Sequence, residues 1–406
     1  MKGKAKHKIT SLREIVSLGT LGTVGNLAAF ALPVIVGALV DSLGLNAREG
    51  GFVGTAEMVG LGMGTIVFSR VILTVSWRKF ATFAILLLAV TNALAPYATD
   101  LYVLYGLRVL SGLGGGMLIS MGAAGLSSTR SPERVLGSIA IISMLFAGAM
   151  LYLLPMIQQA AGIKVMFLTI ALINLSLLFA VPLLPPKSPY VAALESSDNE
   201  VLNPAGTGAA EAQELPAPTG SPLIRLSTLA GIFLYFTAAM AFWVYVERVG
   251  VAAAYTTEQV AQVLGTSQLF GAAGAMTAAI LGTRLGNRIL PVAFGTLLAA
   301  TCAFLMTRES QLAVYAIAAC GFIFTWSVLY PYFMGIGISL DPSAKLVSYS
   351  IVLQTVGKAA GPWLAAMLVT EDSFAPVYWL CCVLFVASLI TLLPATLTTD
   401  RKLRRV

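Results

Sequence analysis

Residues 101–127 read LYVLYGLRVLSGLGGGMLISMGAAGLS, and Arg108 is the only charged residue among them. A helix rises about 1.5 Å per residue, so this stretch is long enough to cross the hydrocarbon core of a bilayer, about 30 Å thick. A charge at membrane depth costs about 2.5 to 3.5 kcal/mol on insertion scales. The stretch therefore predicts a membrane span whose arginine is either paired or functional.

The composition of the whole chain indicates the same class of protein. Of the 406 residues, 58% are hydrophobic and 11% are charged, and the mean hydropathy is +0.87. A soluble domain carries about 25% charged residues. We therefore expect an integral, multi-pass membrane protein in contact with membrane lipid. The net charge of +7 comes from loops and tails beside apolar segments, so we expect no nucleic-acid partner.

Apolar windows of about 20 residues predict twelve spans in an all-α chain. The spans are residues 16–40, 51–73, 80–98, 101–127, 134–157, 163–184, 223–246, 259–281, 290–306, 312–335, 345–369 and 375–396. Between the sixth and the seventh lies a low-complexity segment that cannot build a core. The expected organisation is a tail at 1–15, a bundle at 16–184, a linker at 185–222, a second bundle at 223–396 and a tail at 397–406.

The positions of Lys and Arg predict the orientation in the membrane. With the N-terminus inside, nineteen of the 25 basic residues fall on the side of the termini and four on the other. Cytoplasmic loops carry the excess of positive charge. We therefore expect both termini and the linker in the cytoplasm, and the protein in the cell (inner) membrane.

Two local motifs and the six-plus-six pattern resemble a known family. Residues 107–116, LRVLSGLGGG, are similar to the R-x-x-x-G-x-x-G-G motif of the major facilitator superfamily, and residues 281–288, LGTRLGNR, look like its loop signature L-a-D-R-x-G-R-R with Thr283 in place of the acid. The loop at 72–79 keeps only the basic pair, and the fifth span lacks the Gly-Pro element usual in the family's antiporters. The resemblance implies two pseudo-symmetric six-helix bundles that rock about a central cavity.

Lys358 is the charge that is hardest to explain by packing alone. It lies midway through the eleventh predicted span, and Gln354 precedes it by four residues, which places both on one helical face. A lysine at the centre of a span usually faces a cavity and attracts anions. The alternative is a lysine that reaches a helix carbonyl or the membrane interface. We expect Lys358 and Gln354 to bind substrate.

Glu57 and Arg108 are predicted at similar depths in the second and fourth spans. In the functional interpretation, Arg108 meets the substrate anion and Glu57 exchanges a proton once the anion competes for Arg108. In the alternative, the two form a static ion pair that orders the N-terminal bundle, or a charge reaches the outer surface.

Several further residues are weaker candidates. Ligand contacts are expected from polar or aromatic side chains at mid-depth, for which interhelical packing is the alternative: Asn26, Tyr235, Gln268, Trp326 and Tyr330. Gating is expected from charges at helix ends, for which plain interfacial charges are the alternative, or, through the resemblance, in the loop signature: Glu247, Arg248, Arg284 and Arg288.

The expected function is transport by a secondary transporter, not an enzyme. The only histidine is His7, in the tail, and no phosphate-binding loop follows a strand, so we expect no catalytic constellation, no metal site and no cofactor. The hypothesis is proton-coupled movement of a small organic anion, such as a carboxylate, by a monomer. A proton-driven exporter of drug-like or peptide-like compounds is the alternative, followed by proton-coupled uptake of a neutral solute.

Overall fold

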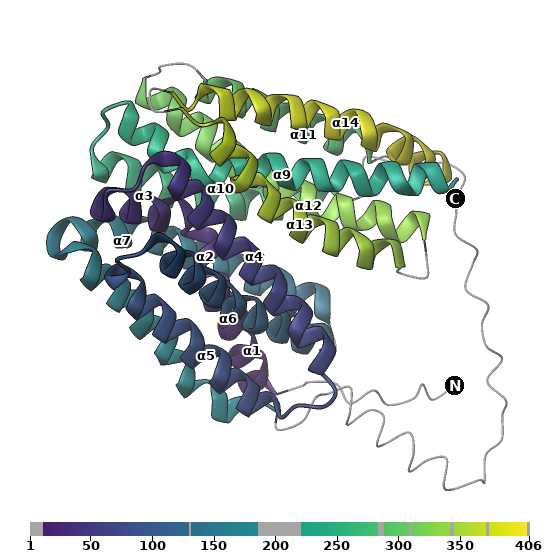
Figure 1. Ribbon diagram of the computed structural model, residues 1–406. Coiled ribbons are helices and arrows are strands. Elements are labelled where there is room, and N and C mark those ends of the chain that lie inside the picture. Colours follow the sequence, from purple (N-terminus) through teal and green to yellow (C-terminus); the bar gives the residue numbers. More distant parts are fainter. Residues whose placement is uncertain are drawn as a thin grey trace, which may run out of the picture.

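Two helical bundles make up the computed structural model, the C-terminal one above the N-terminal one in Figure 1. It describes residues 11–129, 131–185, 221–282, 288–307, 311–341, 345–370 and 373–403. The helices of the N-terminal half are α1 (Leu12–Gly25), α2 (Leu27–Phe30), α3 (Leu32–Leu43), α4 (Ala47–Val71), α5 (Trp77–Leu94), α6 (Leu101–Ser127) and α7 (Pro132–Ser176). Those of the C-terminal half are α9 (Pro222–Ala252), α10 (Thr257–Leu281), α11 (Ile289–Met306), α12 (Leu312–Leu340), α13 (Lys345–Leu368) and α14 (Ala375–Leu403). Short 3-10 turns follow α5 at Ala95–Tyr97 and α7 at Leu177–Phe179 and Val181–Leu183.

Each of the twelve predicted spans has a helical counterpart in the described part of the chain. Among the described residues, ten helices are long and apolar enough to cross a membrane, and α1 to α3 together form a further, bent span. One of the ten covers 50 residues, Arg134–Leu183, and holds two predicted spans separated at Gly162, whose φ of 84° ends the first helix. Ile139 and Leu178 pack beside the same apolar cluster, so the chain reverses at Gly162.

The first span is broken near its middle, and the break is used by the other half of the protein. Its two parts meet at an angle of 48°. Pro33 has no N–H, so the carbonyl of Ala29 lacks its helical donor. The indole Nε1 of Trp243 in α9 donates to the carbonyls of Ala29 and Phe30, at 3.3 and 3.2 Å. The break therefore provides an attachment point between the halves.

Glycines bring α4 and α6 into backbone contact. A Cβ at Gly60 or Gly64 of α4 would collide with a carbonyl of α6, and one at Gly112 or Gly116 of α6 would collide with a carbonyl of α4. Small residues four apart allow helices in lipid to approach this closely. The glycine motif of the fourth span is thus a packing element within the N-terminal half.

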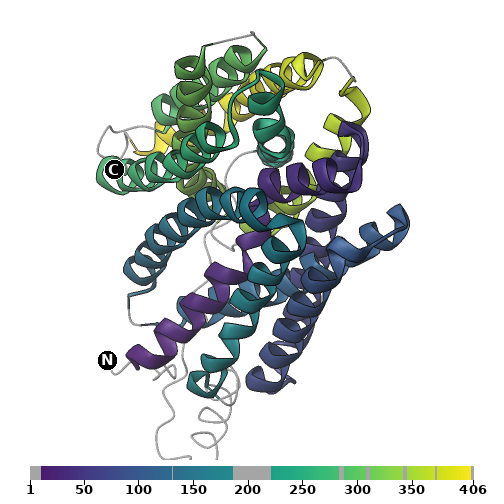
Figure 2. The same cartoon turned by 90° about the vertical axis from the view of Figure 1, so that its left-hand side faces the viewer.

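The halves contact each other at one end of the molecule, toward the left of Figure 1 and facing the viewer in Figure 2. The start of α1 and the end of α14 lie at the opposite end. At the end where the halves meet, the Tyr245 hydroxyl donates to the carbonyl of Ala47 at 2.7 Å. A guanidinium nitrogen of Arg48 lies 3.3 Å from the sulfur of Met367. We refer to this end as the far end and to the end that holds the start of α1 and the end of α14 as the near end.

Candidate functional site

The ammonium group of Lys358 lies among aromatic rings. Its Nζ is 5.4 Å from the ring centroid of Phe236 in α9 and 5.9 Å from that of Trp326 in α12. Both distances fit cation–π attraction, which is worth about 0.5 to 2 kcal/mol depending on desolvation. Within the described residues, Lys358 has no ion pair and no hydrogen bond. The rings lower the cost of the buried charge but leave it without a counter-ion.

The three helices that form this site also extend to the contact between the halves. On α9, Phe236 precedes Trp243 by two turns, and Trp243 binds the broken first span. On α12, Ser327 follows Trp326 directly, and its Oγ lies 3.9 Å from the sulfur of Met144 in α7. On α13, Thr355 packs against Gly62 of α4, where a Cβ would lie 2.7 Å from the threonine methyl. Lys358 is therefore placed at the boundary between the two bundles.

The wall beside Lys358 is aromatic and partly open. The ring of Phe236 meets those of Trp326 and Tyr330 edge-on, at 5.5 and 6.5 Å between centroids. Phe236 is buried, Trp326 and Lys358 are half-buried, and Tyr330 is 42% exposed. Trp326 and Tyr330 are one turn apart on α12, so they present one continuous surface.

Gln354 contributes an unpaired donor on the same helical face as Lys358. The residue is 4% exposed, and its Nε2 has no hydrogen-bond partner among the described residues. A buried polar atom without a partner costs about 1 to 3 kcal/mol. An acceptor supplied by a ligand would remove that cost. The structure thus brings Lys358 against Trp326, with Tyr330 one turn further on α12, and places Gln354 one turn from Lys358 on the same face of α13.

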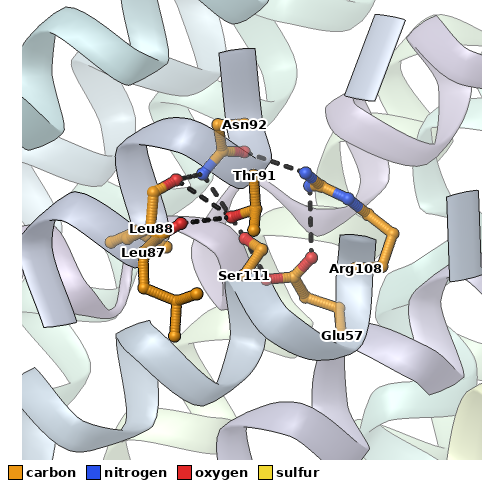
Figure 3. A network of polar contacts seen from close by, with 7 residues as sticks. All are labelled: Glu57, Leu87, Leu88, Thr91, Asn92, Arg108 and Ser111. Carbon is orange, nitrogen blue, oxygen red and sulfur yellow. Dashed lines mark hydrogen bonds and ion pairs between the residues drawn. The ribbon is translucent and has the colours of Figure 1, made fainter. Parts of the chain in front are cut away.

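Glu57 and Arg108 form an ion pair deep inside the N-terminal half (Figure 3). Arg108 Nη1 lies 3.2 Å from Glu57 Oε2, and the two side chains are 0% and 1% exposed. Arg108 Nη2 donates to Asn92 Oδ1 at 3.1 Å, and Ser111 Oγ donates to Glu57 Oε1 at 2.9 Å. The guanidinium also lies over the ring of Phe167, at 5.4 Å. These partners come from α5, α6 and the second part of α7, all in the N-terminal half.

The structure does not bring Arg108 or Glu57 to Lys358. Gly54 and Gly62 mark the face of α4 that meets α13, whereas Glu57 shares the face of Gly60 and Gly64, which meets α6. A change of one residue rotates a side chain by about 100° around a helix. Depth along the span is therefore no guide to which face the charge occupies.

The remaining predicted ligand contacts are scattered. Asn26 is half-buried at the break between α1 and α2, and its side chain has no hydrogen bond within the described chain. Gln268 lies where α10 crosses α7, beside Gly148, and its Nε2 lacks a partner there. Tyr235 packs in the core of the C-terminal half, against the rings of Phe333 and Phe385 at 5.0 and 5.3 Å. Tyr235 also meets Phe236 at 5.4 Å between centroids, so it packs behind the ring that contacts Lys358.

Arg248 joins the two halves at the far end. Its Nη1 and Nη2 donate to the two carboxylate oxygens of Asp41 in α3, at 2.6 and 2.9 Å. Its Nε and Nη2 also donate to Glu247, at 2.6 and 2.8 Å. The carboxylate of Glu247 in turn packs against Gly37 of α3, where a Cβ would collide with it. The predicted gating pair thus sits between α3 and α9.

Arg288 lies within the C-terminal half rather than between the halves. Its Nη1 donates to Ser339 of α12 at 2.6 Å. The carboxylate of Asp400 in α14 accepts from the backbone N–H groups of Arg288 and Ile289, at 2.7 and 3.0 Å, and so caps α11. In this conformation Arg288 ties α11, α12 and α14 together. Arg284 lies outside the described residues.

Sequence reasoning missed four residues that complete these groups. Phe236 is one ring among many in an apolar span, and no local pattern distinguishes it. Asp41 was detectable, because it is an acid at the end of its span on the same predicted side as Arg248. Asn92 and Ser111 are polar residues at mid-span, which indicates a partner without identifying it. Within the described ranges, no cluster of three His, Cys, Asp or Glu side chains could hold a metal ion.

Comparison with known proteins agrees with this architecture. The family model of the Major Facilitator Superfamily matches residues 17–355 of the chain. The structure is similar to that of the xylose transporter XylE from E. coli in a partially occluded inward-open conformation, with a TM-score of 0.69 and 12% identity over 94% of this chain and 97% of that one.

Two further solved structures are similar over nearly the whole chain. A D-xylose-proton symporter gives a TM-score of 0.70 and 13% identity over 95% of this chain and 99% of that one. A variant of the nucleoside transporter NupG gives 0.73 and 8% identity over 94% and 99%. A search of curated proteins found no match. At these identities the structural likeness establishes the fold alone.

Proposed function

This chain belongs to the major facilitator superfamily of secondary transporters, and from that premise we propose that it carries a small organic anion, a carboxylate, which binds Lys358. The single observation that supports this proposal is the unpaired ammonium group at the boundary between the halves. An anion bound there would neutralise the one uncompensated charge of the site. Neutralisation lowers the electrostatic cost of a closed, water-free state.

Alternating access in this proposal is a rocking of the two halves about Lys358. Contacts of Arg248 with Asp41 and of Trp243 with the broken first span hold the far end together. With both termini in the cytoplasm, as the distribution of Lys and Arg predicts, the far end faces outward. The described conformation then corresponds to a transporter closed to the outside.

We place Glu57 and Arg108 outside the substrate path. Both side chains are fully buried and bound to Asn92 and Ser111 within the N-terminal half. We therefore assign to Glu57 and Arg108 a structural role, as a static ion pair that holds α4, α5 and α6 together. Anion recognition is then left to Lys358 and Gln354.

Proton coupling is part of the proposal as the source of energy. The chain has no phosphate-binding loop for direct use of ATP, and one structural relative is named a proton symporter. A symported proton would compensate the charge of the carboxylate and allow accumulation against a gradient.

Transport in proteoliposomes loaded with a pH-sensitive dye tests the proposal. Small carboxylates, neutral solutes and lipophilic cations are added in turn to the wild type, to Lys358→Ala and to Lys358→Arg. Lys345→Ala serves as the matched control, because Lys345 begins the same helix at the near end. We expect proton movement with carboxylates. Its rate should fall at least tenfold in Lys358→Ala and stay unchanged in the control.

Two results would overturn this function. Wild-type carboxylate transport by Lys358→Ala would remove the lysine from the site. Proton movement driven by lipophilic cations, with carboxylates silent, would support the alternative of an exporter of drug-like compounds. The aromatic wall suits that alternative, but the positive charge of Lys358 repels a cation at the same place.

A further inference from the structure

We propose that the transported anion is an aromatic monocarboxylate, whose ring lies on the surface formed by Trp326 and Tyr330 while its carboxylate binds Lys358 and Gln354. This inference rests on the proposed function and deepens it by naming the substrate class. It follows from the juxtaposition, within the described residues, of one free cation, one free amide donor and a half-open wall of rings.

The aromatic surface is partly exposed. Tyr330 is 42% exposed and Trp326 is half-buried, whereas Phe236 behind them is buried. Phe236 contacts both rings in a T-shaped arrangement, at 5.5 and 6.5 Å between centroids, and so supports them from the buried side. Aromatic pairs at centroid distances of about 4.5 to 7 Å contribute about 0.5 to 1.5 kcal/mol beyond the burial of area. An aromatic ligand gains this contribution, and an aliphatic ligand of equal size does not.

The positions of the polar groups fit a carboxylate attached to such a ring. Nζ of Lys358 already lies 5.9 Å from the centroid of Trp326. A carboxylate bonded directly to a ring stacked on Trp326, or separated from it by one methylene, comes within hydrogen-bonding reach of that ammonium. Nε2 of Gln354, buried and without a partner among the described residues, is a second donor one turn away.

The count of charges favours one carboxylate over two. The other buried cations of the described spans, Arg108 and Arg248, are already paired with Glu57, Asp41 and Glu247. A monocarboxylate leaves the site with Lys358 neutralised. A dicarboxylate would add a second, uncompensated charge at membrane depth, which is costly.

The same wall disfavours a polyhydroxylated substrate. A sugar needs a hydrogen-bond partner for each hydroxyl that loses water, because a buried polar group without one costs about as much as a lost hydrogen bond. The contacts of Lys358 are aromatic rings, and Gln354 supplies an amide on the same helical face. These groups offer few hydrogen-bond partners for the hydroxyls of a sugar. The xylose and nucleoside named for the structural relatives do not carry over at 8 to 13% identity.

Uptake of radiolabelled benzoate into proteoliposomes, with unlabelled competitors, tests the inference. The competitors are phenylacetate, cyclohexanecarboxylate as the non-aromatic analogue, phthalate as the dicarboxylate, benzamide as the neutral analogue and gluconate as the polyhydroxylated anion. We expect benzoate and phenylacetate to compete best, with cyclohexanecarboxylate about three- to tenfold weaker, the fold-change that corresponds to the aromatic contribution.

Variants of the wall separate recognition from folding. Trp326→Leu is expected to weaken benzoate about three- to tenfold and leave cyclohexanecarboxylate unchanged, and Trp326→Phe to restore most of the benzoate affinity. Trp379→Leu is the matched control, since Trp379 is a half-exposed ring of α14 that packs on Phe304, remote from Lys358.

The outcomes distinguish the two proposals. If gluconate or cyclohexanecarboxylate equals benzoate and uptake still requires Lys358, the aromatic class is wrong and the anion transporter stands. The same conclusion follows if benzoate is inert while another carboxylate is taken up. If benzoate uptake is indifferent to Lys358→Ala, both proposals fail.

Discussion

Asp41→Asn tests whether the ion pair of Arg248 closes the far end. In the structure, Arg248 of α9 holds both oxygens of Asp41 in α3, at 2.6 and 2.9 Å. The substitution keeps the size of the side chain and removes its charge. Because the pair exists only while the halves touch, its loss weakens the closed state and leaves each half intact. We expect the equilibrium to shift toward opening at this end.

The size of the shift follows from the exposure of the two partners. Arg248 is 7% exposed and Asp41 is 53% exposed, so solvent screens part of the attraction. Exposed ion pairs contribute about 0.2 to 1 kcal/mol, whereas stripping one partner from a buried pair costs about 3 to 5 kcal/mol. Arg248 also retains Glu247 as a partner. We therefore expect the closed state to lose about 1 to 2 kcal/mol of stability, which raises the open population by a factor of about 5 to 30.

Alkylation of a cysteine at position 366 measures that population. Ala366 is 0% exposed and packs against Gly51 at the contact between α13 and α4. In the Ala366→Cys background, a membrane-impermeant maleimide can react only when this contact opens. The labelling rate should rise about 5- to 30-fold in Asp41→Asn. Protein without Ala366→Cys gives the background from the native cysteines.

Glu258→Gln provides the matched control. Glu258 is exposed in the first turn of α10, and it accepts a hydrogen bond from Gln262 of the same helix. Its substitution removes one negative charge without touching a contact between the halves. Equal labelling rates for Asp41→Asn and the unsubstituted protein would refute the role of this ion pair in closure.

Three further groups of substitutions test the packing within the halves, each read as a change in thermal stability of the purified protein. Glu57→Gln or Arg108→Gln alone should cost about 3 to 5 kcal/mol, because each leaves a buried charge unpaired, and the double variant should cost much less; equal losses in all three would contradict the pairing. Gly112→Ala should cost about 1 to 3 kcal/mol by forcing α6 away from α4, whereas Gly106→Ala on the same helix meets open space and should be neutral. Asp400→Ala should cost about 0.5 to 2 kcal/mol by uncapping α11, and Asp400→Asn, which keeps an acceptor, should retain most of the stability.

The class of fold could be predicted because its determinants are local. Each span is a run of apolar residues of the length that a bilayer requires, and the polar segment between the sixth and seventh runs divides the chain. The unusual position of Lys358 is evident for the same reason, since one charge in an apolar run needs no knowledge of its neighbours. These features require no information about contacts between distant residues.

The partners of the charges could not be predicted in the same way. Similar depth in the second and fourth spans predicts that Glu57 and Arg108 can pair, as they do at 3.2 Å. It does not indicate that Arg108 lies apart from Lys358, which the glycine contacts between α4 and α6 decide. The loop signature predicts a gate at Arg288, but its partners Ser339 and Asp400 belong to its own half. The first expectation was limited by helical phase, because adjacent residues point about 100° apart. The second was limited because the partners of Arg288 lie on α12 and α14, far from it in the sequence.

By itself, then, the sequence determined a twelve-span membrane protein in two halves, with a lysine in the middle of the eleventh span. Tertiary structure alone decided what that lysine meets: the rings of Phe236 and Trp326, which come from two other helices of the same half. It also decided that Arg248 pairs with Asp41, 207 residues earlier in the chain. Hydrophobic length is a property of consecutive residues, whereas the pairing of side chains depends on how separate helices cross and rotate against one another.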